Sequence, residues 1–130
     1  MARALRATVE VTPPGVGAPE EASARCQLVN DGDEPVVVNL APLSSPSLAL
    51  AITDGQGEPV LLPPPPVPPA EPAVATLAPG AAHSVEFRGF LPSWTPPGRY
   101  QVRFRYVPGR GNGRWSEETL VSDPADLRIG

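Results

Sequence analysis

Alternation of apolar and polar residues is the dominant pattern along this chain. From Leu5 to Val11 every second residue is apolar and the residues between them are polar, which predicts a strand with one buried face. The same pattern recurs from Ala22 to Leu28 and ends at Asn30-Asp31-Gly32-Asp33, a sequence typical of turns. Further short strands are predicted at Val36 to Leu40, at Leu48 to Ile52 with a return at Val60 to Leu62, at Val74 to Leu77, at Ser84 to Arg88 and at Leu127 to Ile129.

The segment from Tyr100 to Tyr106 has the strictest alternation. Its four bulky residues share one face and its polar residues share the other, so we expect a central strand of a sheet. The glycine-rich stretch from Pro108 to Arg114 follows as a predicted mobile tip, and Trp115 begins a return segment. Seven to nine short strands, with turn sequences between them and no extended helical period, predict an all-β, antiparallel sandwich.

Proline is abundant but clustered. Eight of the 20 prolines fall between Glu58 and Ala73, so the rest of the chain keeps enough apolar residues for a core. We expect residues 1–130 to form a single domain, with a polyproline II connection at about 59–72. That rod either joins two strands or docks into an aromatic groove of a partner.

Two residue positions resemble the immunoglobulin-like fold. In Gly98-Arg99-Tyr100-Gln101-Val102 the tyrosine precedes Val102 by two positions, as the tyrosine of strand F precedes the second core cysteine. Cys26 would occupy the facing position in strand B. The resemblance implies an immunoglobulin-like β-sandwich without a disulfide, and Val36 to Leu40 lacks the tryptophan of antibody domains.

A narrower likeness rests on turn sequences between Leu28 and Tyr106. They are similar to those of bacterial immunoglobulin-like domains, namely intracellular proteinase inhibitors and the non-catalytic domains of deuterolysin-like metallopeptidases. The matching segments are Leu28 to Val36, Asp54-Gly55, Leu77 to Gly80 and Pro97 to Tyr100.

Charge and composition restrict the partners. All ten basic residues are arginine, and 14 acidic residues give a net charge of -4, which disfavours binding to duplex nucleic acid. The abundance of arginine, alanine, proline and glycine is typical of a GC-rich bacterial genome. No apolar run has the length of a signal-peptide core or a membrane span, so we expect a cytoplasmic bacterial protein that does not contact a membrane.

Catalytic, metal and cofactor chemistry find little support. His83 is the only histidine and Cys26 the only cysteine, and a dyad of these two is a conceivable but weakly supported nucleophilic arrangement. We predict no enzyme activity and no cofactor, with Cys26 as a buried, inert thiol. Asn30 to Glu34 has enough oxygen ligands for calcium, but its spacing favours a plain turn. Gly109 to Gly113 lacks the helix that would follow a phosphate loop.

Two groups of residues are candidates for partner binding. In the proline-rich segment 89–97, large apolar side chains either plug one end of the sandwich or anchor a partner. The arginines of segment 100–106 either pair with Glu86 and Glu117 or Glu118, or recognise an acidic partner. With the arginines of the glycine-rich tip, the candidate residues are Phe90, Leu91, Trp94, Arg103, Arg105, Arg110 and Arg114.

The leading hypothesis is therefore a non-catalytic protein-binding or assembly module. The partner would be another protein, or a second copy held through a sheet edge. The alternative is a proteinase inhibitor that acts through rigid loops.

Overall fold

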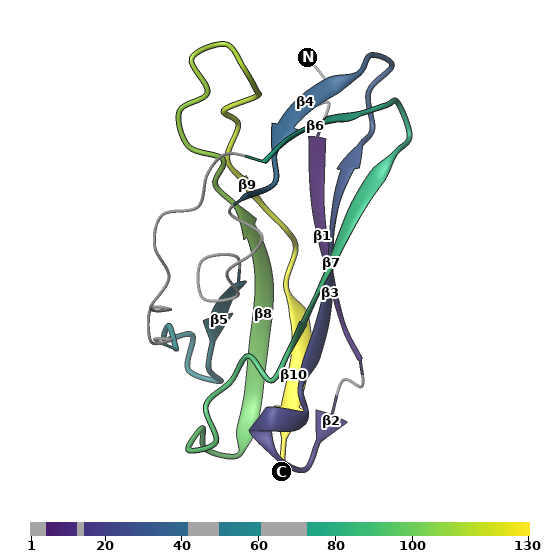
Figure 1. Cartoon of the computed structure of the whole chain (residues 1–130). Helices are drawn as coiled ribbons and strands as arrows, with labels where there is room; N and C mark the ends of the chain where they lie inside the picture. Colours follow the sequence, from purple (N-terminus) through teal and green to yellow (C-terminus); the bar gives the residue numbers. More distant parts are fainter. Residues whose placement is uncertain (1–4, 13–14, 42–49, 61–72) are drawn as a thin grey trace.

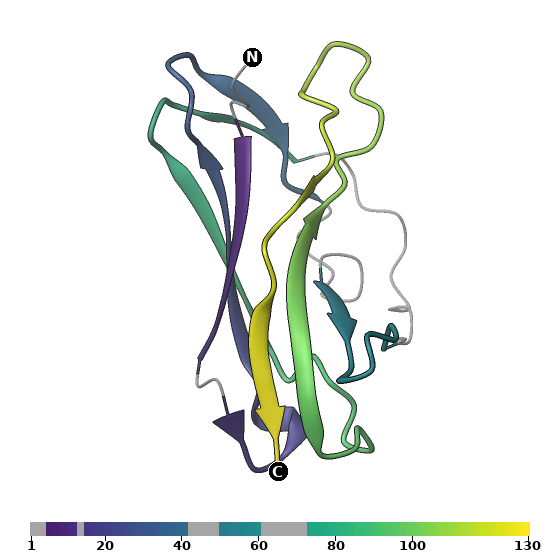
Figure 2. The same ribbon diagram turned by 180° about the vertical axis from the view of Figure 1, so that it is seen from behind.

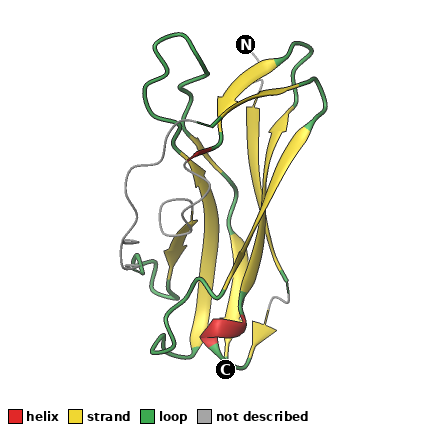
Figure 3. Ribbon diagram, in the orientation of Figure 1, coloured by secondary structure: helices red, strands yellow, loops and turns green. Residues whose placement is uncertain are grey.

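Two facing layers of strands form the body of the described chain (Figures 1 and 3). The computed structural model describes residues 5–12, 15–41, 50–60 and 73–130. A short 3-10 turn, Pro19–Glu21, lies at one end. The strands of the described residues are β1 (Leu5–Val11), β2 (Gly15–Val16), β3 (Ser23–Asn30), β4 (Val36–Asn39), β5 (Leu50–Thr53), β6 (Val74–Leu77), β7 (Ala82–Arg88), β8 (Gly98–Tyr106), β9 (Leu120–Val121) and β10 (Ala125–Ile129). Eight of them have four residues or more, which agrees with the predicted seven to nine.

The first layer is an antiparallel sheet in the order β1-β3-β7. Its middle strand places Cys26 between Val9 of β1 and Val85 of β7. Alternation along β3 turns Cys26 toward the other layer and Arg25 and Gln27 away from it.

The second layer has the order β2-β10-β8-β5, and β9 also pairs with β8. The predicted central position of β8 is confirmed, since β10 and β9 pair with it on one edge and β5 on the other. The pairing of β2 with β10 is parallel, so the chain crosses from the first layer to the second soon after β1 (Figure 2). A small antiparallel sheet of β4 and β6 lies at the end of the molecule where β8 finishes (Figure 1).

The core lies between the layers and contains the residues that the alternation predicts. Cys26, Val102 and Phe104 are each fully buried. The Tyr100 hydroxyl donates a hydrogen bond of 2.5 Å to the carbonyl oxygen of Pro96, four residues upstream, which is the tyrosine corner of immunoglobulin-like domains. The described chain is therefore an antiparallel immunoglobulin-like sandwich, and its single cysteine leaves it without an internal disulfide.

Two buried asparagines satisfy backbone groups where strands end. The Asn30 amide donates to the carbonyl oxygens of Glu34 and Leu77, and its oxygen accepts from the N–H of Gly32. Asn39 donates to the carbonyl oxygen of Pro108. These side chains replace ladder hydrogen bonds that the strands no longer supply.

Several predicted features fall at the limits of the described residues. Thr53 bridges Pro59 and the N–H of Val60 donates to the Ile52 carbonyl oxygen, so the predicted return after β5 is present as far as Val60. Leu48, Leu62 and nearly all of the proline tract at about 59–72 lie outside the described residues. The alternation did not predict the two-residue strands β2 and β9.

Candidate partner-binding surface

The outward face of the second layer carries a group of arginines. On β8 the inward side chains alternate with Arg99, Gln101, Arg103 and Arg105, which point away from the core. On β10 Asp126 and Arg128 lie on the same outward face, because Leu127 and Ile129 are buried. We call Arg99, Arg103, Arg105 and Arg128 the arginine face. It extends about 20 Å along β8, from the rise per residue of a strand.

Register places two of these arginines directly opposite each other. Arg99 pairs across the strands with Arg128, and Gln101 pairs with Asp126. Like charges in directly opposed positions destabilise a sheet. A hollow of about 600 Å³ beside this pair is lined by both arginines and also by Asp54 and Asp126.

Glu86 and Glu117, two of the carboxylates predicted to pair with Arg103 and Arg105, bind other groups. Glu86 lies on β7, in the other layer, and its carboxylate binds the Arg88 guanidinium at 2.6 Å. That contact lowers the pKa of Glu86. The Glu117 carboxylate accepts hydrogen bonds from backbone N–H groups of its own loop. The prediction for Glu86 was wrong because alternation fixes the face of a residue and not its layer.

The connection between β7 and β8 divides its three large apolar residues between core and solvent. Phe90 and Leu91 are 8% and 3% exposed and belong to the core, so they form the predicted plug and are out of reach of a partner. Trp94 is 68% exposed. The Thr95 N–H and hydroxyl both donate to the carbonyl oxygen of Pro92, at 3.0 and 2.6 Å, which fixes the turn that carries Trp94.

The glycine-rich stretch, predicted as a mobile tip, is a loop braced by hydrogen bonds to the residues that follow it. Trp115 is buried, and its indole N–H donates to the carbonyl oxygen of Gly109. The Glu117 carboxylate accepts from the N–H groups of Gly111 at 2.6 Å and Asn112 at 3.2 Å. A Cβ on Gly111 would lie 2.8 Å from the Trp115 carbonyl oxygen, so only glycine fits there without movement.

Both tip arginines are exposed, but they differ in their contacts. The Arg114 guanidinium lies 4.7 Å from the centroid of the Trp115 ring, which is the distance of a cation–π contact. Arg110 projects from the braced loop. This loop extends beyond the end of β8, whereas the β7–β8 connection lies at the start of β8 (Figure 1).

The candidate residues therefore fall into separate regions. Trp94 lies at the same end of β8 as Arg99 and Arg128, and Arg103 and Arg105 follow along the strand. Arg99 and Arg128 are not among the residues predicted from the sequence. Alternation alone places each on an outward face, but their opposition depends on the register between β8 and β10.

Cys26 and His83, the two residues considered for catalysis, do not face each other across β3 and β7. Cys26 lies opposite Val85, and His83 lies opposite Leu28. Burial raises the pKa of the Cys26 thiol to about 12, so the nucleophilic thiolate is not formed at neutral pH.

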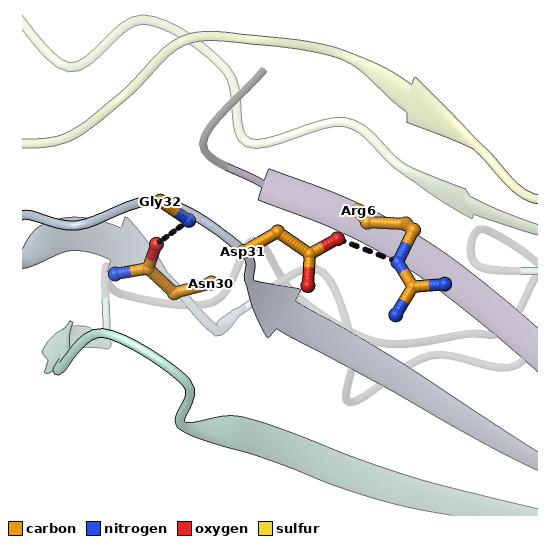
Figure 4. Close-up of polar contacts among 4 residues, drawn as sticks. All are labelled: Arg6, Asn30, Asp31 and Gly32. Atoms are coloured by element: carbon orange, nitrogen blue, oxygen red, sulfur yellow. Dashed lines mark hydrogen bonds and ion pairs between the residues drawn. The ribbon is translucent and has the colours of Figure 1, made fainter. Parts of the chain in front are cut away.

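In the turn considered as a calcium site, two of the candidate ligand oxygens already bind other groups of the protein. The Asn30 side-chain oxygen accepts from Gly32, and the Asp31 carboxylate binds the Arg6 guanidinium at 2.7 Å (Figure 4). These contacts support the plain-turn interpretation. Among the described residues, no three His, Cys, Asp or Glu side chains gather as a metal site.

Comparisons with known proteins support the fold. No model of a protein family matches the sequence, and no curated protein matches it. The structure is similar to the C-terminal domain of Wzt, with 13% identity, a TM-score of 0.55, and 99% of this chain and 75% of that chain covered. At this identity the likeness shows an immunoglobulin-like β-sandwich and nothing more.

Two further solved structures match with TM-scores below 0.5. A CARDB domain from Pyrococcus furiosus, solved with di-metal ions, has 13% identity and a TM-score of 0.48, over 97% of this chain and 87% of that chain. A β-glucosidase from Listeria innocua has 16% identity and a TM-score of 0.47, over 97% of this chain and 16% of that chain. Separately, no helix among the described residues has the length and apolar character needed to cross a bilayer.

Proposed function

We propose that this sandwich is a non-catalytic protein-binding module whose arginine face docks an acidic partner protein. The observation that carries the proposal is the direct opposition of Arg99 and Arg128 on an exposed sheet face. Four of the ten basic residues of this protein of net charge -4 lie on the arginine face, and Asp126 of β10 is an acidic side chain among them.

Carboxylates are the ligands that suit this face. A guanidinium binds a carboxylate through two parallel hydrogen bonds, and such pairs are stronger than neutral hydrogen bonds. An acidic segment laid along β8 would also relieve the repulsion between Arg99 and Arg128. The cost of that repulsion in the free protein supports a role in binding, because local rules are most often broken at functional sites.

Trp94 would add an apolar anchor at one end of the interface. Its turn is fixed by Thr95, so little conformational freedom is lost when the indole is covered. Tryptophan and arginine are the residues most enriched among binding hot spots. Phe90 and Leu91 would support this turn from the core instead of contacting the partner.

A non-catalytic role agrees with the chemistry of the two reactive side chains. Cys26 is fully buried with a raised pKa, and His83 lies opposite Leu28 on the neighbouring strand. Neither is placed to act as an activated nucleophile or a base.

The experiment selects ligands from a displayed peptide library with the full chain as bait. We expect acidic peptides to be enriched and to bind more weakly as the salt concentration rises. Arg99→Ala combined with Arg128→Ala should weaken binding about tenfold or more, because two charge-assisted contacts are lost. Arg25→Ala, on the outward face of the other layer, is the matched control and should change affinity less than twofold, or about 0.4 kcal/mol. Equal effects of the two changes would contradict the proposal.

The second candidate, a proteinase inhibitor, is favoured by the braced loop. A rigid loop that exposes Arg110 is the kind of segment that can enter a protease cleft without first being ordered. The test measures residual activity of a panel of serine, cysteine and metallo-peptidases with the wild-type protein and with Arg110→Ala. Inhibition that the substitution removes would support this candidate, and absence of inhibition by the wild-type protein would exclude it.

A further inference from the structure

The outer edge of β1 is a free strand edge. β1 pairs with β3 along its whole length, and no described strand pairs with its other side. Its seven residues contain neither proline nor glycine, the residues that would prevent a further strand from pairing.

The pairing with β3 identifies the free backbone groups. The N–H of Thr12 donates to the Ser23 carbonyl oxygen at 3.1 Å. Thr12 and Ser23 are the next opposed pair after Val11 and Ala24, so they form a hydrogen-bonded pair of the ladder. Because bonded pairs alternate in an antiparallel ladder, Arg6, Thr8 and Glu10 use their backbone groups on β3. The backbone N–H and carbonyl groups that point to the free edge belong to Leu5, Ala7, Val9 and Val11.

A groove runs beside this edge. It has a volume of about 470 Å³ and lies between residues 5–9 of β1 and residues 120–124. On the side formed by residues 120–124, the strand pairing with β8 is interrupted between β9 and β10. There the Ser122 hydroxyl accepts a hydrogen bond from the Phe104 N–H, in place of a backbone carbonyl oxygen. Val121 lines the groove and is 56% exposed. Figure 2 shows β1 and β10 alongside each other at this side of the sandwich.

We propose that β1 pairs with β1 of a second copy of this chain, antiparallel about Thr8, to form one continuous six-stranded sheet. In this register each Arg6 lies opposite Glu10 of the second copy, and the two Thr8 residues oppose each other. The hydrogen-bonded positions then fall on Ala7 with Val9 and on Leu5 with Val11. These are the four residues whose backbone groups are free, so ladder geometry and charge select the same register.

The charged side chains are able to make this contact. Glu10 lies opposite Arg25 of β3, but within the described residues it forms no ion pair. Arg6 binds Asp31 at the surface (Figure 4), and both side chains are substantially exposed. A guanidinium has five N–H donors, so Arg6 can bind a second carboxylate. Registers centred on Arg6 or on Glu10 would oppose like charges.

The free edge of β7 does not offer an equivalent antiparallel register with complementary charges. Its charged residues Glu86 and Arg88 already bind each other on the same strand. A register that overlaps all of β7 would also place Arg88 opposite Ala82. The inference is independent of the proposed function, since the arginine face belongs to the other layer.

The test exchanges the two charges and measures mass by sedimentation over a concentration series of the full chain. The wild-type protein should move from 13.6 kDa toward twice that mass as concentration rises. Arg6→Glu alone, or Glu10→Arg alone, should raise the dimer dissociation constant about tenfold or more, because both symmetric contacts become repulsive. The double variant Arg6→Glu/Glu10→Arg should recover dimerisation.

A mixture of the two single variants gives the sharpest outcome. All charged contacts between an Arg6→Glu chain and a Glu10→Arg chain are attractive, so these two poorly dimerising proteins should form a heterodimer. Asp31→Asn controls for the loss of the internal Arg6–Asp31 pair and should leave the dissociation constant within about twofold. A wild-type chain that stays monomeric throughout, or a mixture that does not associate, would overturn the proposal.

Hydrogen exchange tests the ladder without any substitution. The amides of Leu5, Ala7, Val9 and Val11 should become protected as concentration rises, whereas those of Thr8 and Glu10 should be protected at every concentration. Protection that does not depend on concentration at the first four positions would also overturn the proposal.

Discussion

The Tyr106 hydroxyl bonds both backbone groups of Asn39, donating to its carbonyl oxygen and accepting from its N–H, each at 3.0 Å. Both residues are buried. One hydroxyl thus takes the place of a neighbouring strand, and it attaches the small β4–β6 sheet to the end of β8.

Tyr106→Phe should lower the free energy of unfolding by about 1–3 kcal/mol, because it leaves a buried N–H and a buried carbonyl without a partner. Urea denaturation followed by circular dichroism measures the change. Tyr100→Phe is the matched control. It removes one hydrogen bond, to Pro96, and should cost about 0.5–1.5 kcal/mol. Similar losses in the two variants would contradict the bridging role of Tyr106.

Asn30→Asp should destabilise the protein by about 2–4 kcal/mol at neutral pH, because a buried carboxylate would face the carbonyl oxygens of Glu34 and Leu77. Burial would raise the pKa of the new carboxyl group, so the loss relative to wild type should shrink as the pH falls and the group becomes protonated. Denaturation of both proteins at neutral and acidic pH tests this. Asp31→Asn alters the same turn at the surface and should cost at most about 1 kcal/mol.

Stability should fall as the pH rises from about 9 toward 12. Burial raises the pKa of Cys26 from 9.0 to about 12, and it also raises the pKa values of Tyr100 and Tyr106. In this range the unfolded chain loses protons that the folded chain retains, so the unfolded state is favoured. The thermal midpoint should therefore decrease with pH, and less steeply in Cys26→Ala. A slope that Cys26→Ala leaves unchanged would assign the effect to other groups.

The two tryptophans should report opposite environments. With Trp115→Phe the remaining indole, Trp94, is exposed and should be quenched readily by acrylamide, whereas with Trp94→Phe the buried Trp115 should be protected. Trp94→Phe should change stability by less than about 0.5 kcal/mol. Trp115→Phe should cost more, because it removes the indole that braces the loop through Gly109. Equal quenching in the two variants would contradict the described loop.

Alternation predicted the fold well because it is a local property. The core face of β8 and the buried position of Cys26 follow from period-two spacing within single segments, and the resemblance to immunoglobulin-like domains implied the tyrosine corner at Tyr100. The strands β2 and β9 could not be predicted, since two residues carry no period. They are stabilised by their neighbours β10 and β8 instead.

The candidate surface was less predictable because it depends on contacts between distant segments. Arg103 and Arg105 were placed on the outward face correctly, but assigning Glu86 as their partner required knowing the layer of β7. Asn39 was not singled out, because a single polar residue in a strand carries no local signal of its buried contacts. The bracing of the glycine-rich loop depends on Trp115 and Glu117, which follow it in the sequence.

The parallel pairing of β2 with β10 has a mechanical consequence. The start of β1 and the end of β10 lie at opposite ends of the sandwich, and β2 and β10 run in the same direction (Figures 1 and 2). Stretching the molecule by its ends would draw these strands past each other along their axes. Their hydrogen bonds would then share the load together instead of breaking one after another, so this short contact would resist extension more strongly than its length suggests.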